Sequence, residues 1–154
     1  MKPAGVRHRL PPDELSAIGA ALAEASRHDA ALQSMLVARL LETNATDLAD
    51  LRFAVARRDW PGVRRTVHRI KGAAALAGCT SLVAAGKSIE SAAGQGNGAV
   101  VNTLLPRYIA ILDAFNDTLS AVEASAILPM QTVQRTGTLA SGAGSAPNSI
   151  RRRP

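Results

Sequence analysis

The feature that most constrains the fold is a run of apolar residues whose spacing alternates between four and three. Its members are Val101, Leu105, Tyr108, Leu112, Phe115, Leu119 and Val122. Steps of this size return to one face of an α-helix, so the run predicts a long helix with a continuous apolar stripe. Such a stripe must be buried against other elements of the chain. Pro106 is expected to kink this helix or to mark its first turn.

Three amphipathic helices are predicted upstream of residue 59. The first begins at Pro11-Pro12-Asp13-Glu14, because proline is tolerated in a first turn and acidic side chains favour the positive end of the helix dipole. The second is capped by Asp29 and ends near Thr43-Asn44, and the third is capped by Asn44 or Thr46. Their apolar stripes are, in order, Leu15, Ile18 and Leu22; Leu32, Leu36 and Leu40 with Met35 alongside; and Leu48, Leu51 and Val55.

Two more helices are predicted before the long one. Asp59 caps the fourth, with Pro61 in its first turn, and Gly78 is the residue at which this helix stops. The fifth opens at Thr80 and ends at the glycine-rich stretch 94–98. Its apolar side consists of Leu82, Gly86, Ile89 and Ala93.

The composition agrees with one all-α domain. The chain has 154 residues, of which 47% are hydrophobic but only 3% aromatic, a mixture that favours closely packed helices over a sheet. We expect a flexible N-terminus over 1–11, a helical bundle over 12–125 and a disordered tail over 126–154. The single Cys79 excludes an internal disulfide and is expected to be buried.

The net charge of +6 suits an acidic protein surface or a nucleic acid, and charge alone does not choose between them. The N-terminus has no apolar stretch behind its charges, and the chain has no membrane-spanning run. We therefore expect a soluble, cytoplasmic protein that contacts no membrane.

The fourth helix carries the candidate site. At about 100° per residue, its stripe of Val63, Val67, Ile70, Ala74 and Ala77 turns His68 about 140° away, toward solvent. Surface neighbours of the imidazole are Arg64, Arg65, Lys71, Gly72 and Ala75. A neutral imidazole is a competent nucleophile, cations beside it can hold phosphoryl oxygens, and a glycine one turn away leaves room for another protein.

The stretch His68-Arg69-Ile70-Lys71-Gly72-Ala73-Ala74, followed by Gly78, resembles the signature of histidine-containing phosphotransfer (HPt) domains. The segment from Thr80 to Ala93, with the Ile89-Glu90 pair, is similar to the next helix of that family. The segment from Asn44 to Trp60 is similar to the preceding one. The chain is most similar to the HPt modules of virulence-type hybrid sensor kinases.

The resemblance implies an antiparallel four-helix bundle with an accessory N-terminal helix. It implies that His68 relays a phosphoryl group between aspartates of response-regulator receiver domains in a two-component multistep phosphorelay. Lys71 would give electrostatic support, Gly72 steric access, and Arg64, Arg65 and Ala75 would dock the partner. The partner would supply Mg²⁺, so we expect no cofactor, metal site or ATP site of the chain's own. We expect a monomer whose partners are receiver domains. A hybrid sensor histidine kinase is a further candidate partner.

Two other function classes fit part of the same sequence pattern. A basic helical module that binds nucleic acid or protein without phosphotransfer would use the same charge, but no helix is rich in Arg, Asn or Gln at base-reaching positions. The phosphoaccepting domain of a chemotaxis-type kinase is a further rival, although the chain has no candidate nucleotide-binding region. His8 and His28 are interpreted as solvated or capping residues, Glu90 as a solvated side chain, and Trp60 as a packing anchor.

Overall fold

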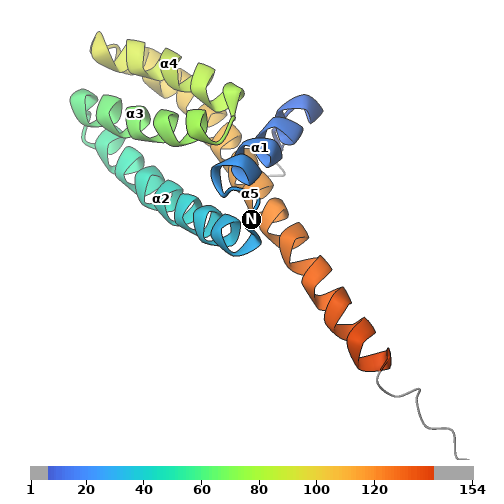
Figure 1. Ribbon diagram of the computed structural model, residues 1–154. Helices are drawn as coiled ribbons and strands as arrows, with labels where there is room; N and C mark the ends of the chain where they lie inside the picture. The colour runs from blue at the N-terminus through green and yellow to red at the C-terminus, as the bar shows by residue number, and fades with distance from the viewer. Residues whose placement is uncertain (1–6, 141–154) are drawn as a thin grey trace, which may run out of the picture.

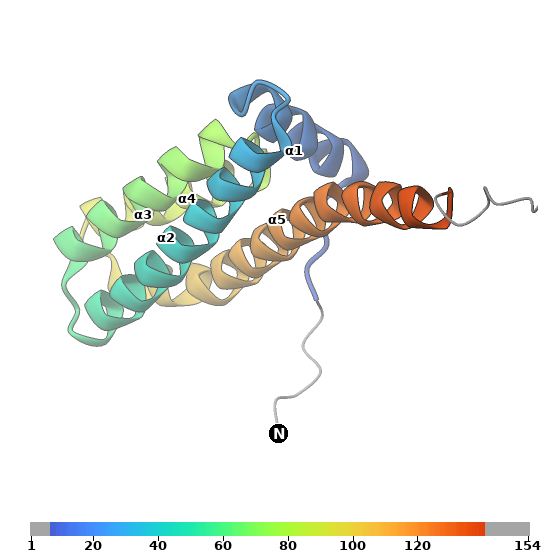
Figure 2. The same ribbon diagram turned by 60° about the horizontal axis from the view of Figure 1, so that its bottom comes forward.

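The structure is a computed structural model that describes the backbone of residues 7–140 and the side chains of residues 7–125. It contains five helices: α1 (Pro12–Ala25), α2 (Ala30–Ala56), α3 (Trp60–Leu76), α4 (Thr80–Gly94) and α5 (Gly98–Ala140). No strand occurs among the residues described. Helices α2 to α5 alternate in direction and form the four-helix bundle, while α1 lies across one end (Figures 1 and 2). The predicted all-α fold is confirmed.

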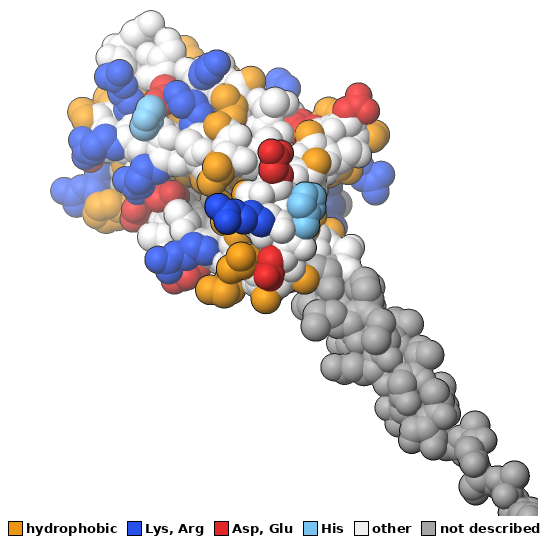
Figure 3. Space-filling view, viewed as in Figure 1, with side chains coloured by type: hydrophobic (Ala, Val, Ile, Leu, Met, Phe, Trp, Pro, Cys, Tyr) orange, Lys and Arg blue, Asp and Glu red, His pale blue; other side chains and the backbone are white. Residues whose placement is uncertain are grey.

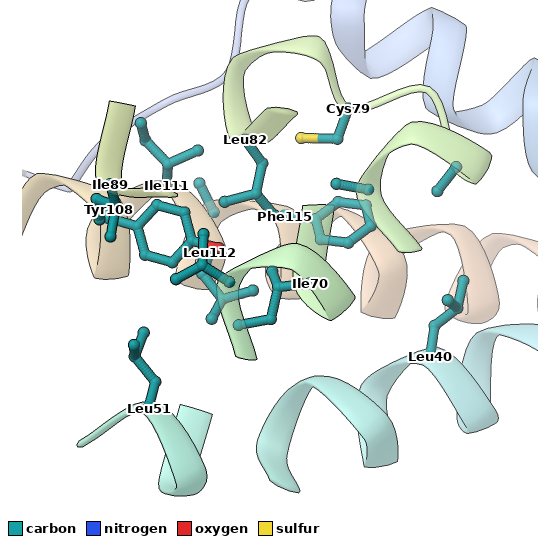
Figure 4. Close-up of a cluster of buried hydrophobic side chains, with 14 of the residues drawn as sticks. Leu40, Leu51, Ile70, Cys79, Leu82, Ile89, Tyr108, Ile111, Leu112 and Phe115 are labelled. Carbon is teal, nitrogen blue, oxygen red and sulfur yellow. The ribbon is translucent and has the colours of Figure 1, made fainter. Parts of the chain in front are cut away.

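The core is formed by one buried face of each helix together with Leu10, which precedes α1. Side chains from four helices meet in its centre, including Leu51 of α2, Ile70 of α3, Leu82 of α4 and Phe115 of α5 (Figure 4). Cys79 is also fully buried there, as predicted. Most of the predicted stripe of α5 is buried, and its Leu105 and Val122 are partly so.

The prediction of two helices between residues 29 and 59 is wrong, because α2 is a single helix over this stretch. Asp29 caps it as expected, since its Oδ1 accepts a hydrogen bond from Leu32 N at 3.0 Å. Neither polar residue caps a new helix, because the amide nitrogen of Asn44 bonds another helix and the hydroxyl of Thr46 bonds the preceding turn. Asn44 Nδ2 donates to Asn116 Oδ1 of α5 at 2.8 Å, and Thr46 Oγ1 donates to the carbonyl of Glu42 at 3.2 Å.

The stripes of the first two helices were also placed imperfectly. Leu15 of α1 and both Leu32 and Met35 of α2 are exposed. The buried face of α2 instead begins at Val37 and includes Leu40. The continuous helix carries this face through Asn44 and Asp47, which are polar residues that an apolar pattern does not detect.

Both ends of the domain differ from the expected boundaries. Leu10 is only 4% exposed, so the packed chain starts within the stretch expected to be flexible. Helix α5 begins at Gly98, passes through Pro106 and is described to Ala140, beyond the expected end of the bundle at residue 125, while the disordered tail stays a prediction. Extending an existing helix needs no new nucleus, and weak propensity therefore suffices. Residues 1–6 and 141–154 lie outside the described part of the chain.

Candidate functional site

The N-terminal cap and the buried face of α3 fix the orientation of this helix about its own axis. Asp59 Oδ1 accepts a hydrogen bond from Gly62 N at 3.0 Å, Pro61 lies in the first turn, and Gly78, at φ +80°, follows the end. All five residues of the predicted stripe are at most 1% exposed. The prediction for this helix is confirmed, and burial of that face turns the opposite face outward.

Trp60 fixes the start of α3 against the start of α5. A Cβ atom added at Gly98 would lie 2.4 Å from the Trp60 ring, so the indole packs directly on the glycine backbone. This contact agrees with the interpretation of Trp60 as a packing anchor.

His68 lies on the outward face, with 71% of its side chain exposed. Its Nδ1 is 2.8 Å from Oε1 of Glu90 on α4. The other carboxylate oxygen of Glu90 accepts a hydrogen bond from Nζ of Lys71, one turn along α3. The three side chains therefore form a cluster that joins α3 to α4. In it, the imidazole and the ammonium each bond one oxygen of the same carboxylate.

The carboxylate of Glu90 is ionised at neutral pH. Its partial burial raises the pKa, but hydrogen bonds from Lys71 and His68 outweigh the burial and lower the pKa below the ordinary value of 4.5. An ionised carboxylate only accepts hydrogen bonds, so Nδ1 of a neutral His68 must carry the proton. The lone pair then resides on Nε2, the nitrogen that makes no hydrogen bond to any described residue.

Glu90 is not the solvated side chain predicted from the sequence, because it bonds both His68 and Lys71. The usable signal was that Glu90 follows Gly86 by one turn on the same side of α4. Gly86 is buried where α4 meets α3, with Lys71 and Val67 beside it. A carboxylate one turn from that contact is well placed to reach the exposed edge of α3.

The surface on the C-terminal side of His68 is open. A Cβ atom added at Gly72 would meet nothing within 4 Å, and Ala75 is exposed. Leu76 is also 63% exposed. A second protein can therefore approach the imidazole over this part of α3 without displacing a side chain.

The surface on the N-terminal side is basic. Arg64 and Arg65 are exposed and line a shallow hollow together with His68 and Glu90. Lys and Arg side chains gather around an exposed histidine over α3 in the space-filling view (Figure 3). Arg69 is used differently, because its guanidinium bonds Asp47 at 2.8 Å and Asp50 at 3.0 Å and so ties α3 to α2.

The other histidines lie away from this cluster. His28 is exposed in the turn between α1 and α2, at φ 59°, and His8 precedes α1 and is half-buried. Within residues 7–125, no group of three His, Cys, Asp or Glu side chains is arranged to hold a metal ion. No helix in the described part of the chain is long and apolar enough to cross a membrane.

Comparison with known families agrees with this geometry. The family model described as the Hpt domain matches residues 35–125, which span most of α2, all of α3 and α4, and the packed part of α5. No curated protein and no solved structure matches the chain. The matched stretch is more than half of the chain and contains His68, Lys71, Gly72 and Glu90. The chain therefore belongs to the Hpt domain family, the histidine phosphotransfer modules of two-component systems.

Proposed function

We propose that His68 accepts a phosphoryl group from the aspartyl phosphate of one receiver domain and passes it to the aspartate of another, in a multistep phosphorelay. The observation that carries the proposal is the exposed imidazole whose Nδ1 is held by Glu90. That arrangement directs the Nε2 lone pair to solvent, where an incoming phosphorus atom must arrive.

In the proposed step, Nε2 attacks phosphorus in line and the bond from phosphorus to the aspartyl oxygen breaks. The leaving carboxylate stays on the receiver, and the ring becomes a phosphoimidazole that carries positive charge until Nδ1 shares its proton with Glu90. Glu90 is thus a positioning residue that fixes the tautomer and stabilises the charge formed. The reverse sequence returns the group to a second receiver.

Lys71 balances the charge of Glu90 and lies one turn from His68. We assign it electrostatic support of the cluster, because its ammonium keeps Glu90 ionised and adds positive charge beside the incoming phosphoryl oxygens. Gly72 gives steric access, and Arg64, Arg65 and Ala75 meet the partner. The proposal assigns no cofactor to this chain; Mg²⁺ held by the receiver would neutralise the phosphoryl oxygens.

The test is transfer of labelled phosphate from phosphorylated receiver domains to the wild-type chain, to His68→Gln and to His28→Asn. The last variant removes an exposed histidine at a positive φ that asparagine tolerates. We expect acid-labile label on the wild type and His28→Asn and none on His68→Gln. Label retained by His68→Gln would refute the proposal, as would oligonucleotide binding by a chain that takes up no phosphate.

A further inference from the structure

A group of exposed residues lies at the corner where α2 ends and α3 begins. We call it the basic corner, and it consists of Phe53, Arg57, Arg58, Arg64 and Arg65. Resting on the function proposed above, we propose that the basic corner extends the docking surface beyond the neighbourhood of His68. Its partner would be an acidic surface of the receiver domain that also offers an apolar recess to Phe53.

The corner is continuous with the site. Asp50, Phe53 and Arg57 follow one another at steps of three and four, so they lie along one strip of α2. Asp50 Oδ2 bonds the guanidinium of Arg69 at 3.0 Å, and Arg69 is the chain neighbour of His68. The strip that carries Phe53 and Arg57 therefore borders the exposed face of α3.

The arginines of the corner have no acidic partner in the described part of the chain. Asp50 is occupied by Arg69, and Asp59 is occupied as the cap of α3. Arg57 instead lies over the ring of Phe53, with its guanidinium carbon 5.3 Å from the ring centre. Unpaired cations held beside a nucleophile attract an acidic partner and accelerate its encounter.

Phe53 adds an apolar anchor to this charge. The ring is 65% exposed although the core of α2 lies one residue away, at Ala54. Exposed aromatic rings next to arginine are typical of the residues that dominate protein–protein interfaces. The same guanidinium that stacks on the ring can then pair with an acidic side chain of the partner.

A receiver fits this surface better than a nucleic acid does. A protein partner that covers the imidazole of His68 also meets Arg64 and Arg65, which are exposed one turn before the histidine. The cationic side chains seen in Figure 3 surround the histidine over α3 and continue to the end of the bundle where α2 meets α3. The surface of one receiver domain can therefore cover His68 and the basic corner at the same time.

The experiment measures the second-order rate constant of transfer from a phosphorylated receiver over a range of salt concentrations. The double variant Arg57→Gln/Arg58→Gln should lower it about fivefold at low salt and approach the wild type at high salt. Phe53→Ala should lower it at every salt concentration. The matched control Arg39→Gln removes an exposed arginine about 27 Å away along α2 and should leave the rate constant unchanged.

Phosphoramidate, a small donor without a docking surface, tests the reactivity of His68 separately from the docking of a receiver. If it labels His68 equally in all variants while only the corner variants are slow with the receiver, the inference holds. If it labels His68 and the corner variants react with the receiver as fast as Arg39→Gln does, the inference fails and the proposed function stands. If neither donor labels His68, both fail. Duplex DNA binding lost in the double variant, with transfer unchanged, assigns the corner to nucleic acid and overturns the inference.

Discussion

Two carboxylates link α4 to other helices, one at each end of α4, and their comparison separates what serves the proposed reaction from what serves the fold. Glu90, near the C-terminal end of α4, bonds the side chains of His68 and Lys71. Glu14 of α1 reaches the N-terminal end, where Oε1 accepts from Ser81 N at 2.6 Å and Oε2 accepts from Ser81 Oγ at 2.5 Å. About 14 Å of helix separates the two contacts.

The pKa of each carboxylate is lowered, but the partners differ in kind. For Glu14, burial raises the pKa, and hydrogen bonds from Ser81 outweigh it. A backbone N–H cannot change its charge, so Glu14 is a static cap that fastens α1 to the bundle. In the proposed reaction, by contrast, the imidazole beside Glu90 changes its charge because it becomes phosphorylated. A depressed carboxylate pKa therefore indicates a functional role only when the partner group can react.

The largest expected effect tests the static end. Glu14→Ala leaves the Ser81 amide and hydroxyl of a nearly buried contact without an acceptor, and it should lower the free energy of unfolding by about 2 kcal/mol. Urea denaturation measures the loss, with the exposed Glu24→Ala on the same helix as a control expected to change it by less than about 0.5 kcal/mol. His68 labelling by phosphoramidate should be unaffected. Slower labelling at temperatures where the variant is folded would show that Glu14 also affects the reactivity of His68.

The next effect tests the reactive end. Glu90→Gln keeps the size of the side chain but removes the charge that stabilises the phosphorylated ring, so labelling of His68 should slow about tenfold. The free energy of unfolding should fall less than in Glu14→Ala, because the introduced amide oxygen can still accept one of the two hydrogen bonds. A matched Ser91→Ala change on the exposed side of α4 should leave both quantities unchanged. A stability loss as large as that of Glu14→Ala, without a kinetic effect, would make Glu90 a structural residue.

A smaller effect concerns the open side of the imidazole. Alanine at Gly72 meets nothing within 4 Å and improves helix propensity, so Gly72→Ala should raise the free energy of unfolding by about 1 kcal/mol. The added methyl should slow transfer from a receiver and leave labelling by phosphoramidate unchanged. The matched control is Gly19→Ala on α1, where an added Cβ atom also meets nothing within 4 Å, so it should stabilise the fold similarly and leave transfer unchanged. If Gly72→Ala is faster with the receiver, steric access is not the role of this glycine.

Local signals predicted α3 and its site well. The cap at Asp59, the proline in the first turn and the apolar stripe from Val63 to Ala77 all describe the same helix, and together they determine that His68 faces outward. The signature around His68 then indicated the family. Each of these observations depends on residues close in sequence, which is why the sequence alone was sufficient to predict α3 and the exposure of His68.

Contacts between distant segments were beyond local patterns. Asn44 has the residue type of a helix cap, but its side chain bonds Asn116 at 72 residues' separation, inside a continuous α2. The partner of His68 is 22 residues away on another helix, so the role of Glu90 depends on how α3 and α4 pack. Glu14 presents the same difficulty, since its residue type favours a first turn whereas its actual partner is the start of α4.

The smallest effect is the pH dependence of stability at the static end. A carboxyl group whose pKa is lowered by folding stabilises the native state above its ordinary pKa of 4.5, and this contribution is lost as the pH falls through the lowered value. Glu14→Gln retains an acceptor for Ser81 N but does not titrate. The free energy of unfolding of the wild type should therefore fall more steeply than that of Glu14→Gln as the pH is lowered below about 5. Glu90 is present in both proteins, so its contribution to the pH dependence of unfolding is the same and cancels in their difference. Parallel curves would mean that the charge of Glu14 adds nothing to its hydrogen bonds, and the static end would then depend on geometry alone.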